Sequence, residues 1–287
     1  MLGSEVAKLF VRNYEIVELN RQKFPAYARN GHFQIGSNPN ELKSFFGHEK
    51  VNYVINCAGQ IRQKIDEKNV ISRNTAVQAN FELPLILAEL SEKFNFKVIQ
   101  IGTDCVFSGQ KGNYTESDRH DAHDIYGKSK SAGEIPHENF SILRSSIVGK
   151  EKESNYSLMS WLLSQPLGAT INGFNDQYWN GISVLHFAKF IKAIIENGSF
   201  ENFKGVHHIV PNDVVSKAEL LTLFSKYFGR EDLRIESVPS GNALNMTLST
   251  SHASVNETLW NLAGYCAPLT IEEMILEYSK SIRQGAK

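Results

Sequence analysis

FKVIQIGTDCVFSG, residues 96–109, reads as a buried strand that ends in polar residues. The run VNYVINCAG (51–59) has the same apolar character and ends in small residues. A helical pattern at about 71–94 lies between the two, and Pro84 inside it predicts a kink or a restart of the helix near Leu83. Strands that alternate with helices are typical of βαβ units. The sequence therefore predicts an α/β fold with a doubly wound parallel sheet.

This regular alternation continues to the strand FSILRSSIVG (140–149) and then loosens into shorter, less regular strands. We therefore expect one domain over 1–149 and a smaller α/β lobe over 150–287. The segment SVLHFAKFIKAIIENG has apolar residues at helical spacing, with Ser183 as its N-cap. It predicts a helix at about 183–197 that packs back on the first domain.

Bulk composition argues against several classes of partner. Lys and Arg total 30 against 31 for Asp and Glu, so the net charge of −1 creates no field that favours nucleic acid or an anionic membrane. No apolar run reaches the roughly 20 residues of a membrane span, and none has the pattern of a signal peptide. We therefore expect a cytoplasmic protein whose partner is a small molecule.

Two sets of residues that often bind metals have simpler explanations here. The three cysteines are odd in number and widely spaced, which favours reduced thiols; they are Cys57, Cys105 and Cys266. A cluster at His120, Asp121 and His123 has a spacing that could begin a metal site, but a polar loop explains it more simply. We expect no metal.

A tyrosine and a lysine in YGKSK are candidates for acid–base chemistry. Among the ten tyrosines, only Tyr126 has a lysine four residues later, Lys130, and on a helix that spacing puts both on one face. A neighbouring ammonium group favours the phenolate, which brings the tyrosine pKa closer to neutral pH. The pattern also arises by chance roughly once in every chain or two of this size, so its context must decide.

That context is the end of the strand in IGTDCVFSG. Thr103 stands there, and a hydroxyl at that place can hold a substrate carbonyl oxygen while Tyr126 gives it a proton. Open α/β sheets bind their ligands at the carboxyl ends of strands. Alternatively, Thr103 is an ordinary turn hydroxyl and Asp104 caps or turns the chain.

Five motifs occur in a characteristic order and spacing: VNYVINCAG, VQANFELPLILAEL, GTDCVFSGQKGNYTESD, YGKSKSAGE and ILRSSIVG. Together they resemble the extended short-chain dehydrogenase/reductases, and among these the dTDP-4-dehydrorhamnose reductase branch, which modifies nucleotide sugars. The resemblance covers nearly all of 1–149 and, more loosely, 150–287, where WNGIS, GVHHIV and SKAELL also fit.

The resemblance implies a Rossmann-like NAD(P)-binding domain over 1–149, a substrate lobe over 150–287, and reduction of a nucleotide-linked 4-keto-6-deoxy sugar. It makes Tyr126 the proton donor and Thr103 the group that polarises the sugar carbonyl. Lys130 would lower the pKa of Tyr126 and bind the nicotinamide ribose. Small residues match positions along the cofactor, namely Gly3, Cys57, Ala58 and Gly59. A homodimer is ordinary for this family.

Residues near the second strand bear on the choice of cofactor. An acidic residue there would favour NAD, whereas this chain has Asn20 and Arg21. Arg21 could pair with a 2′-phosphate, so NADP(H) is favoured and NAD(H) is the alternative; Arg21 could equally be a solvated surface charge. Gln34, followed by Ile35, stands where relatives often carry Asp beside the adenine.

The expected sugar pocket contains Thr103, Asp104, Cys105 and Ile147. Two of these depart from the family pattern, because Cys105 replaces a common tyrosine and Ile147 replaces a tryptophan of the rhamnose-pathway enzymes. The loss of two aromatic contacts puts the rhamnose precursor in doubt, but not the reaction class. Trp161 or Trp179 could compensate from the second lobe, or either could be ordinary packing.

Two other functions remain open. A nucleotide-sugar epimerase or dehydratase that retains NAD would want an acidic residue beside the threonine, and Asp104 meets that need. A non-catalytic, regulatory homologue would keep the fold, but it has no chemical need for Thr103, Tyr126 and Lys130 together. No G-x-S-x-G nucleophile motif occurs.

The opening residues match only the tail of a phosphate-binding loop. In the family the segment reads G-x-x-G-x-[LM]-G, and Met1, Leu2 and Gly3 match its end. On this basis we expect the sheet to lack its first strand, and we expect weaker cofactor binding and lower stability than in a longer form.

Overall fold

The computed structural model describes residues 1–20, 29–32, 39–151 and 155–285. For positions 20, 29–32, 39 and 285 it describes the backbone alone. Arg21, Gln34 and Ile35 lie outside the described residues, so their expected roles beside the cofactor stay predictions.

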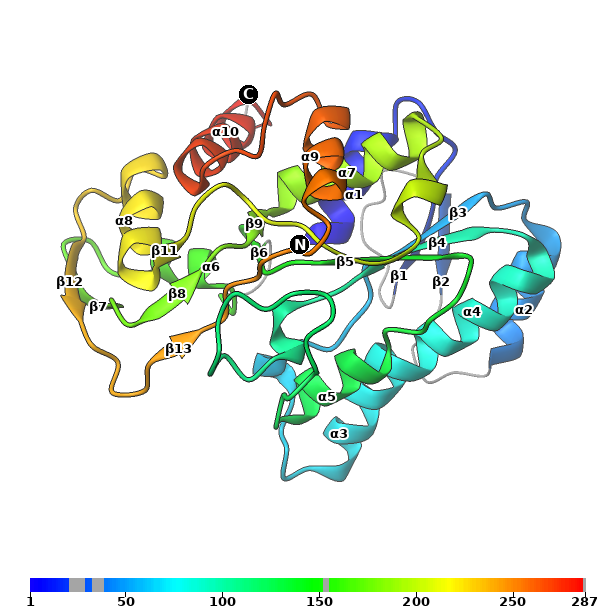
Figure 1. The fold of residues 1–287 in the computed structure, drawn as a ribbon, viewed down its shortest axis with the longest axis horizontal. Helices are drawn as coiled ribbons and strands as arrows, with labels where there is room; N and C mark the ends of the chain where they lie inside the picture. The colour runs from blue at the N-terminus through cyan, green and yellow to red at the C-terminus, as the bar shows by residue number, and fades with distance from the viewer. Residues whose placement is uncertain (21–28, 33–38, 152–154, 286–287) are drawn as a thin grey trace.

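Four parallel strands form the central sheet in the order β10-β5-β4-β3. Figure 1 labels β5, β4 and β3. In chain order they are β3 (Tyr53–Asn56), β4 (Lys97–Ile101), β5 (Phe140–Arg144) and β10 (Gly205–His208). The predicted α/β fold with a parallel, Rossmann-like sheet is confirmed. Within the described residues β3 has a paired neighbour only on its β4 side, and β1 (Val17–Asn20) and β2 (Arg29–His32) form a separate parallel pair.

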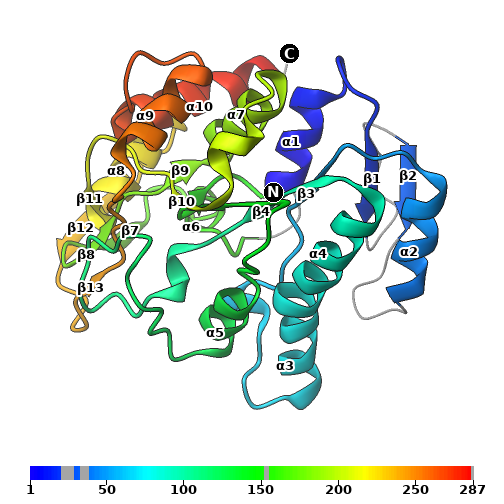
Figure 2. The same cartoon turned by 45° about the vertical axis from the view of Figure 1, so that its right-hand side comes forward.

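Helices cover both faces of this sheet. Successive side chains of a strand point to opposite faces, so β3, β4 and β5 contribute apolar residues to two separate cores. Ile99 of β4 belongs to a core with α1 (Leu2–Phe10) and α7 (Val184–Glu196). Val98 belongs to a second core, with α2 (Pro39–His48) and α4 (Leu83–Phe94). Figure 2 shows α1 and α7 on one side of the strands and α4 on the other.

The predicted interruption near Leu83 is a π-helical turn. Helix α3 (Val70–Val77) begins at Asn69, whose side chain accepts hydrogen bonds from two backbone amides of the first turn. The π turn η2 (Gln78–Glu82) follows, and α4 begins at Leu83 with Pro84 in its first turn, where proline is tolerated. The turn buries Asn80 beneath α5 (Ile125–Ala132).

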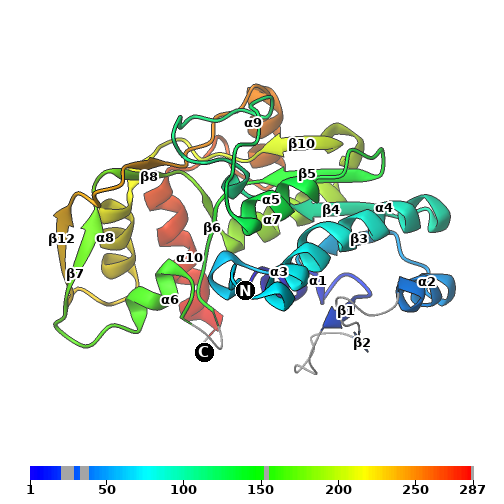
Figure 3. The same cartoon turned by 90° about the horizontal axis from the view of Figure 1, so that it is seen from below.

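Short strands and helices of the C-terminal half make up the far end of the molecule (Figure 3). Strand β8 (Gln177–Trp179) pairs with β11 (Val215–Ser216) and β13 (Leu244–Asn245), while β7 (Thr170–Phe174) pairs with β12 (Arg234–Val238). The remaining elements are β6 (Ile147–Val148), β9 (Ile182–Ser183), α6 (Leu158–Leu163), α8 (Lys217–Tyr227), α9 (Ala253–Leu262), α10 (Ile271–Gly285) and the 3-10 turns η1 (Arg62–Lys64), η3 (Asp104–Val106) and η4 (Phe200–Phe203).

Helix α7 joins the two halves of the chain. Its N-cap is Ser183, as expected, and its apolar face is fully buried. Phe187 and Ile191 share one core with Val6 and Phe10 of α1 and with Trp260 of α9. The helix therefore packs on the N-terminal half, whereas the domain boundary at Gly149 stays a prediction.

Gly133, at the end of α5, should tolerate no side chain. A Cβ there would lie 1.8 Å from the carbonyl oxygen of Asn80, so Gly133→Ala must push α5 away from the π turn. We expect Gly133→Ala to lower the free energy of unfolding by about 1–3 kcal/mol in urea melts.

Gly47→Ala, in α2, is the matched control. Its Cβ would meet nothing closer than 4.0 Å, so it should be neutral or stabilise the protein by up to about 1 kcal/mol. Equal effects of the two substitutions would show that the contact of α5 with the π turn does not limit stability.

Candidate functional site

Helix α5 carries Tyr126 and Lys130 and is held against the loop that carries Thr103. Its N-cap is Asp124, whose side chain accepts from the amide of Gly127 at 2.7 Å. A Cβ on Gly127 would lie 2.3 Å from the carbonyl oxygen of Cys105. The glycine in YGKSK therefore permits close approach of the helix to the end of β4.

The predicted trio does converge. The Thr103 hydroxyl accepts from the amide of Cys105 at 3.2 Å and donates to a carboxylate oxygen of Asp104 at 3.1 Å. The Thr103 hydroxyl lowers the pKa of the Tyr126 phenol, so the two side chains lie close together. Lys130 Nζ donates to the carbonyl oxygen of Ile101 at 2.7 Å, at the end of the same strand.

The pKa of Tyr126 is raised, whereas the sequence predicted that Lys130 would lower it. Burial raises it above its ordinary value, the neighbouring Cys105 and Asp104 raise it further, and Thr103 and the Arg62 guanidinium lower it. The ammonium group of Lys130, which was expected to lower this pKa, donates to a backbone carbonyl. Burial also lowers the pKa of Lys130 to about 8, although the charge of Glu134 partly opposes this.

Small residues cluster where β3 ends, beside Lys130. The Cβ of a side chain on Gly3 would lie 3.5 Å from Cβ of Cys57, so Gly3 lies next to the first of the three small residues at 57–59. Burial raises the pKa of the Cys57 thiol to about 12. Ala58 donates its amide to the Asn56 side chain, and a Cβ on Gly59 would meet the Asn80 amide oxygen at 3.1 Å. The cofactor candidates Gly3 and 57–59 thus form one surface of short side chains; Asn20 is described by its backbone only.

Asn80 is a site residue that sequence reasoning missed, although its motif was noticed. Its side-chain amide accepts from the amide of Gln60 at 2.9 Å and donates to the Gln60 carbonyl at 3.1 Å. It also donates to Ser129 Oγ at 3.0 Å, between Tyr126 and Lys130. Asn80 therefore ties the cofactor-side loop to α5.

The two departures from the family pattern lie in the same region. Burial and the charge of Asp104 raise the pKa of Cys105. Ile147 pairs with Ile182 between β6 and β9. Of the two tryptophans considered as replacements, Trp179 is buried in the main core and Trp161 is exposed on α6.

Behind α5, the buried side chain of Arg144 forms hydrogen bonds with several segments around the site. Arg144 is 1% exposed, and its guanidinium donates to the carboxylate of Glu134 at 3.1 and 2.5 Å. It also donates to Nε2 of His208 at 2.5 Å and of His120 at 2.9 Å. Because arginine is a donor only, both histidines accept and are neutral here. Nδ1 of His120 in turn forms a hydrogen bond with Ser131 Oγ at 2.6 Å.

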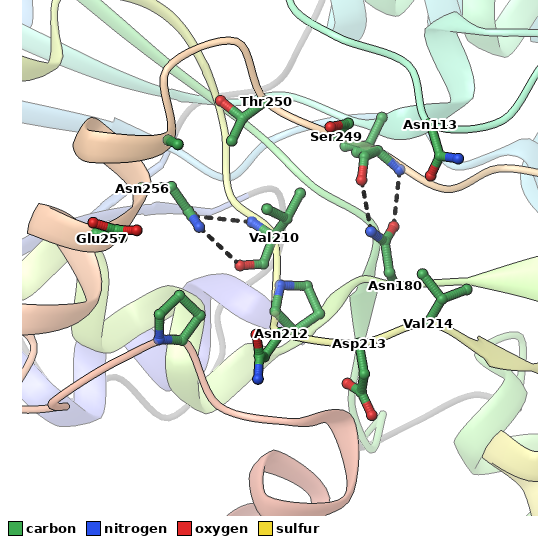
Figure 4. A pocket seen from close by; sticks show the side chains of 14 residues that line it. Asn113, Asn180, Val210, Asn212, Asp213, Val214, Ser249, Thr250, Asn256 and Glu257 are labelled. Atoms are coloured by element: carbon green, nitrogen blue, oxygen red, sulfur yellow. Dashed lines mark hydrogen bonds between the residues drawn. The ribbon is translucent and has the colours of Figure 1, made fainter.

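A cavity of about 350 Å³ lies elsewhere, among Asn180, Val210, Asp213, Thr250 and Asn256 (Figure 4). The amides of Asn180 and Asn256 make paired bonds to the backbones of Leu248 and Val210. These asparagines therefore hold loops together, and the cavity contains none of the predicted catalytic residues.

No group of three or more His, Cys, Asp or Glu among the described residues is arranged to hold a metal ion. None of the described helices combines the length and apolar character needed to cross a membrane.

Residues 1–282 match the family described as RmlD substrate binding domain. A dTDP-4-dehydrorhamnose reductase of Aggregatibacter actinomycetemcomitans is 33% identical over 136 residues, which cover 46% of this chain and 42% of that protein. The match thus spans less than half the length of this curated relative.

Solved structures show the same fold over almost the whole chain. A dTDP-4-dehydrorhamnose reductase from Clostridium acetobutylicum has a TM-score of 0.73 at 20% identity, covering 98% of this chain and 96% of that one. The Bacillus anthracis enzyme of that name, in complex with NADP, has a TM-score of 0.72 at 19% identity, covering 98% and 95%. A dTDP-glucose 4,6-dehydratase from Bacillus anthracis, in complex with NAD, has a TM-score of 0.71 at 16% identity, covering 99% of this chain and 94% of that one.

The arginine network should make the protein sensitive to acid. Burial and the charge of Arg144 lower the pKa of His208 from 6.5 to about 4. The unfolded chain therefore takes up this proton first, so the stabilisation is complete above about pH 6.5 and is lost as pH falls towards 4. Between about pH 7.5 and about pH 5, the free energy of unfolding should fall by about 2 kcal/mol more in the wild type than in His208→Gln.

Urea melts at both pH values measure this difference. His48→Gln, a substitution on the exposed surface of α2, is the control and should keep the wild-type slope. An unchanged slope in His208→Gln would show that this histidine does not carry the acid sensitivity.

Proposed function

The chain belongs to the RmlD substrate binding domain family, and from this premise we propose that it reduces a nucleotide-linked 4-keto-6-deoxy sugar with NADP(H). The observation that carries the proposal is the convergence of Thr103, Tyr126 and Lys130 at the end of β4. A curated relative is named dTDP-4-dehydrorhamnose reductase, and one solved relative is in complex with NADP. Both support this substrate class and the preference for NADP(H) over NAD(H).

The residues beside Lys130 suit a nicotinamide cofactor. Gly3 lies against Cys57 and Gly59 against Asn80, with an added Cβ at 3.5 Å and 3.1 Å from those side chains, so small residues are packed closely at the end of β3, where the nicotinamide ribose would lie. Lys130 is the cation that would reach the ribose. When bound, the reduced cofactor supplies the hydride.

The protein's own groups deliver the proton. Thr103 and Tyr126 would both bond the carbonyl oxygen of the sugar, so the charge that develops there is met by two hydroxyls. Tyr126 holds its proton firmly, because burial raises its pKa, and it gives the proton up as the oxygen becomes an alkoxide. Arg62, which lowers the pKa of Tyr126, favours that transfer.

Asp104 favours a second candidate, a dehydratase or epimerase that retains NAD. Its carboxyl is buried and its pKa is raised, chiefly by burial, so it can keep a proton beside Thr103. Such an enzyme would act on a nucleotide-linked sugar without added cofactor. A homodimer, the other partner expected from the resemblance, stays a prediction.

Tyr126→Phe should lower kcat for reduction of dTDP-4-keto-6-deoxyglucose by about 10²-fold or more, because the proton donor is lost. The affinity for NADPH should change by less than about twofold, since the ring remains in place. Loss of NADPH absorbance measures the rate, and fluorescence titration measures the affinity.

Tyr227→Phe, at the surface of α8, is the matched control and should keep the wild-type rate. A wild-type rate in Tyr126→Phe would rule out this tyrosine as the proton donor. Water loss from dTDP-glucose without added cofactor would favour the dehydratase. Normal NADPH binding without turnover of either sugar would favour a regulatory homologue.

A further inference from the structure

A short segment between β3 and α3 is attached to the site at both of its ends. At one end, the Gln60 backbone exchanges two hydrogen bonds with the Asn80 side chain, at 2.9 and 3.1 Å. At the other end, a carboxylate oxygen of Glu67 accepts from the amide of Ile125 at 3.0 Å. Ile125 comes directly before Tyr126, so the segment is fixed on the helix that carries the candidate proton donor.

Arg62 lies within this segment and contacts the ring of Tyr126. It begins η1, and its guanidinium carbon lies over the ring, 5.9 Å from the centroid, within the range of a cation–π contact. Its Nη2 lies 2.6 Å from one carboxylate oxygen of Asp124, whose other oxygen accepts from the amide of Gly127 as the N-cap of α5. The ion pair therefore ties the guanidinium to the first turn of the helix that carries Tyr126.

The groups around the phenol act on its charge in both directions. Burial and the neighbours Cys105 and Asp104, on η3, raise the pKa of Tyr126, whereas Arg62 lowers it. The ammonium group of Lys130, on the same helix, donates to a backbone carbonyl oxygen at 2.7 Å. In this arrangement Arg62 is a cation in contact with the ring, and a cation favours the charged form of a phenol.

We propose that Arg62 is a positioning residue for proton transfer, which holds the Tyr126 ring on α5 and stabilises the tyrosinate that the transfer leaves. This inference rests on the proposed function for the step itself. In that step the O–H bond of Tyr126 breaks and its proton passes to the sugar oxygen, while the carbonyl carbon takes the hydride. Tyr126 is then a tyrosinate beside a guanidinium until water returns the proton; Arg62 itself exchanges no proton.

Titration of the Tyr126 phenol tests this proposal without any catalysis. The full chain is labelled with 3-fluorotyrosine, a more acidic phenol, at its ten tyrosines, and the Tyr126 resonance is the fluorine signal that Tyr126→Phe lacks. In Arg62→Gln the midpoint of that signal should rise by about 0.5–1 pH unit, because a charge that favours the tyrosinate is lost. Arg62→Lys, which keeps the charge, should restore most of the wild-type midpoint.

Lys64→Gln is the matched control. Lys64 lies in the same 3-10 turn and carries the same charge, but its ammonium group lies over the ring of Tyr156, 5.5 Å from the centroid. Its substitution should leave the fluorine midpoint and the rate of reduction unchanged. An equal shift in Lys64→Gln would overturn the proposal, because the effect would then come from the overall charge of the turn.

Kinetics give a second measurement. Arg62→Gln should lower kcat for reduction of dTDP-4-keto-6-deoxyglucose by about three- to tenfold, with KM and NADPH affinity changed by less than about twofold. In a Tyr126→Phe background the same substitution should have no further effect, because Arg62 acts through the tyrosine. Additive losses, or a loss confined to KM, would overturn the proposal, because Arg62 would then bind the substrate directly.

The outcome is separable from that of the proposed function. If the fluorine midpoint depends on Arg62 but no keto sugar is reduced, the contact with the tyrosinate stands and the reductase fails. If Tyr126-dependent reduction is intact while the midpoint and the rate ignore Arg62→Gln, the reductase stands and this role of Arg62 fails.

Discussion

The buried guanidinium of Arg144 is the interaction on which the site depends. A charge with 1% exposure is tolerated only when its donors are satisfied, and Glu134, His120 and His208 accept them. These partners come from the end of α5, the loop before it and strand β10. Arg144 therefore sets where α5 lies, and with it the two catalytic candidates on that helix.

The same network extends into the C-terminal half. Nδ1 of His208 donates to the carbonyl oxygen of Ser249 at 2.6 Å, and Glu116 accepts from His208, Thr250 and Ser251. These bonds hold the pKa of Glu116 near 2, although burial opposes them. The halves are thus joined by polar contacts beside the site as well as by α7.

Predictions that rest on local patterns agree with the structure. Thr103 lies just after β4, Tyr126 and Lys130 lie four residues apart on α5, and the helix restarts at Leu83 next to Pro84, whereas the catalytic roles of these residues stay predictions. Residues whose roles depend on distant partners were missed. Asn80 bonds Ser129 across 49 positions, so its role leaves no periodic signal in the sequence.

The sequence by itself determined the alternation of strands and helices, the parallel sheet and the choice of Thr103, Tyr126 and Lys130 as the candidate trio, because hydrophobic periodicity and short spacings are local properties. Only the tertiary structure decided the electrostatics of that trio. Burial and the neighbours Cys105 and Asp104 raise the pKa of Tyr126, while Lys130 turns to Ile101. Desolvation and through-space charge depend on what packs around a group, and packing brings together residues that the chain keeps far apart.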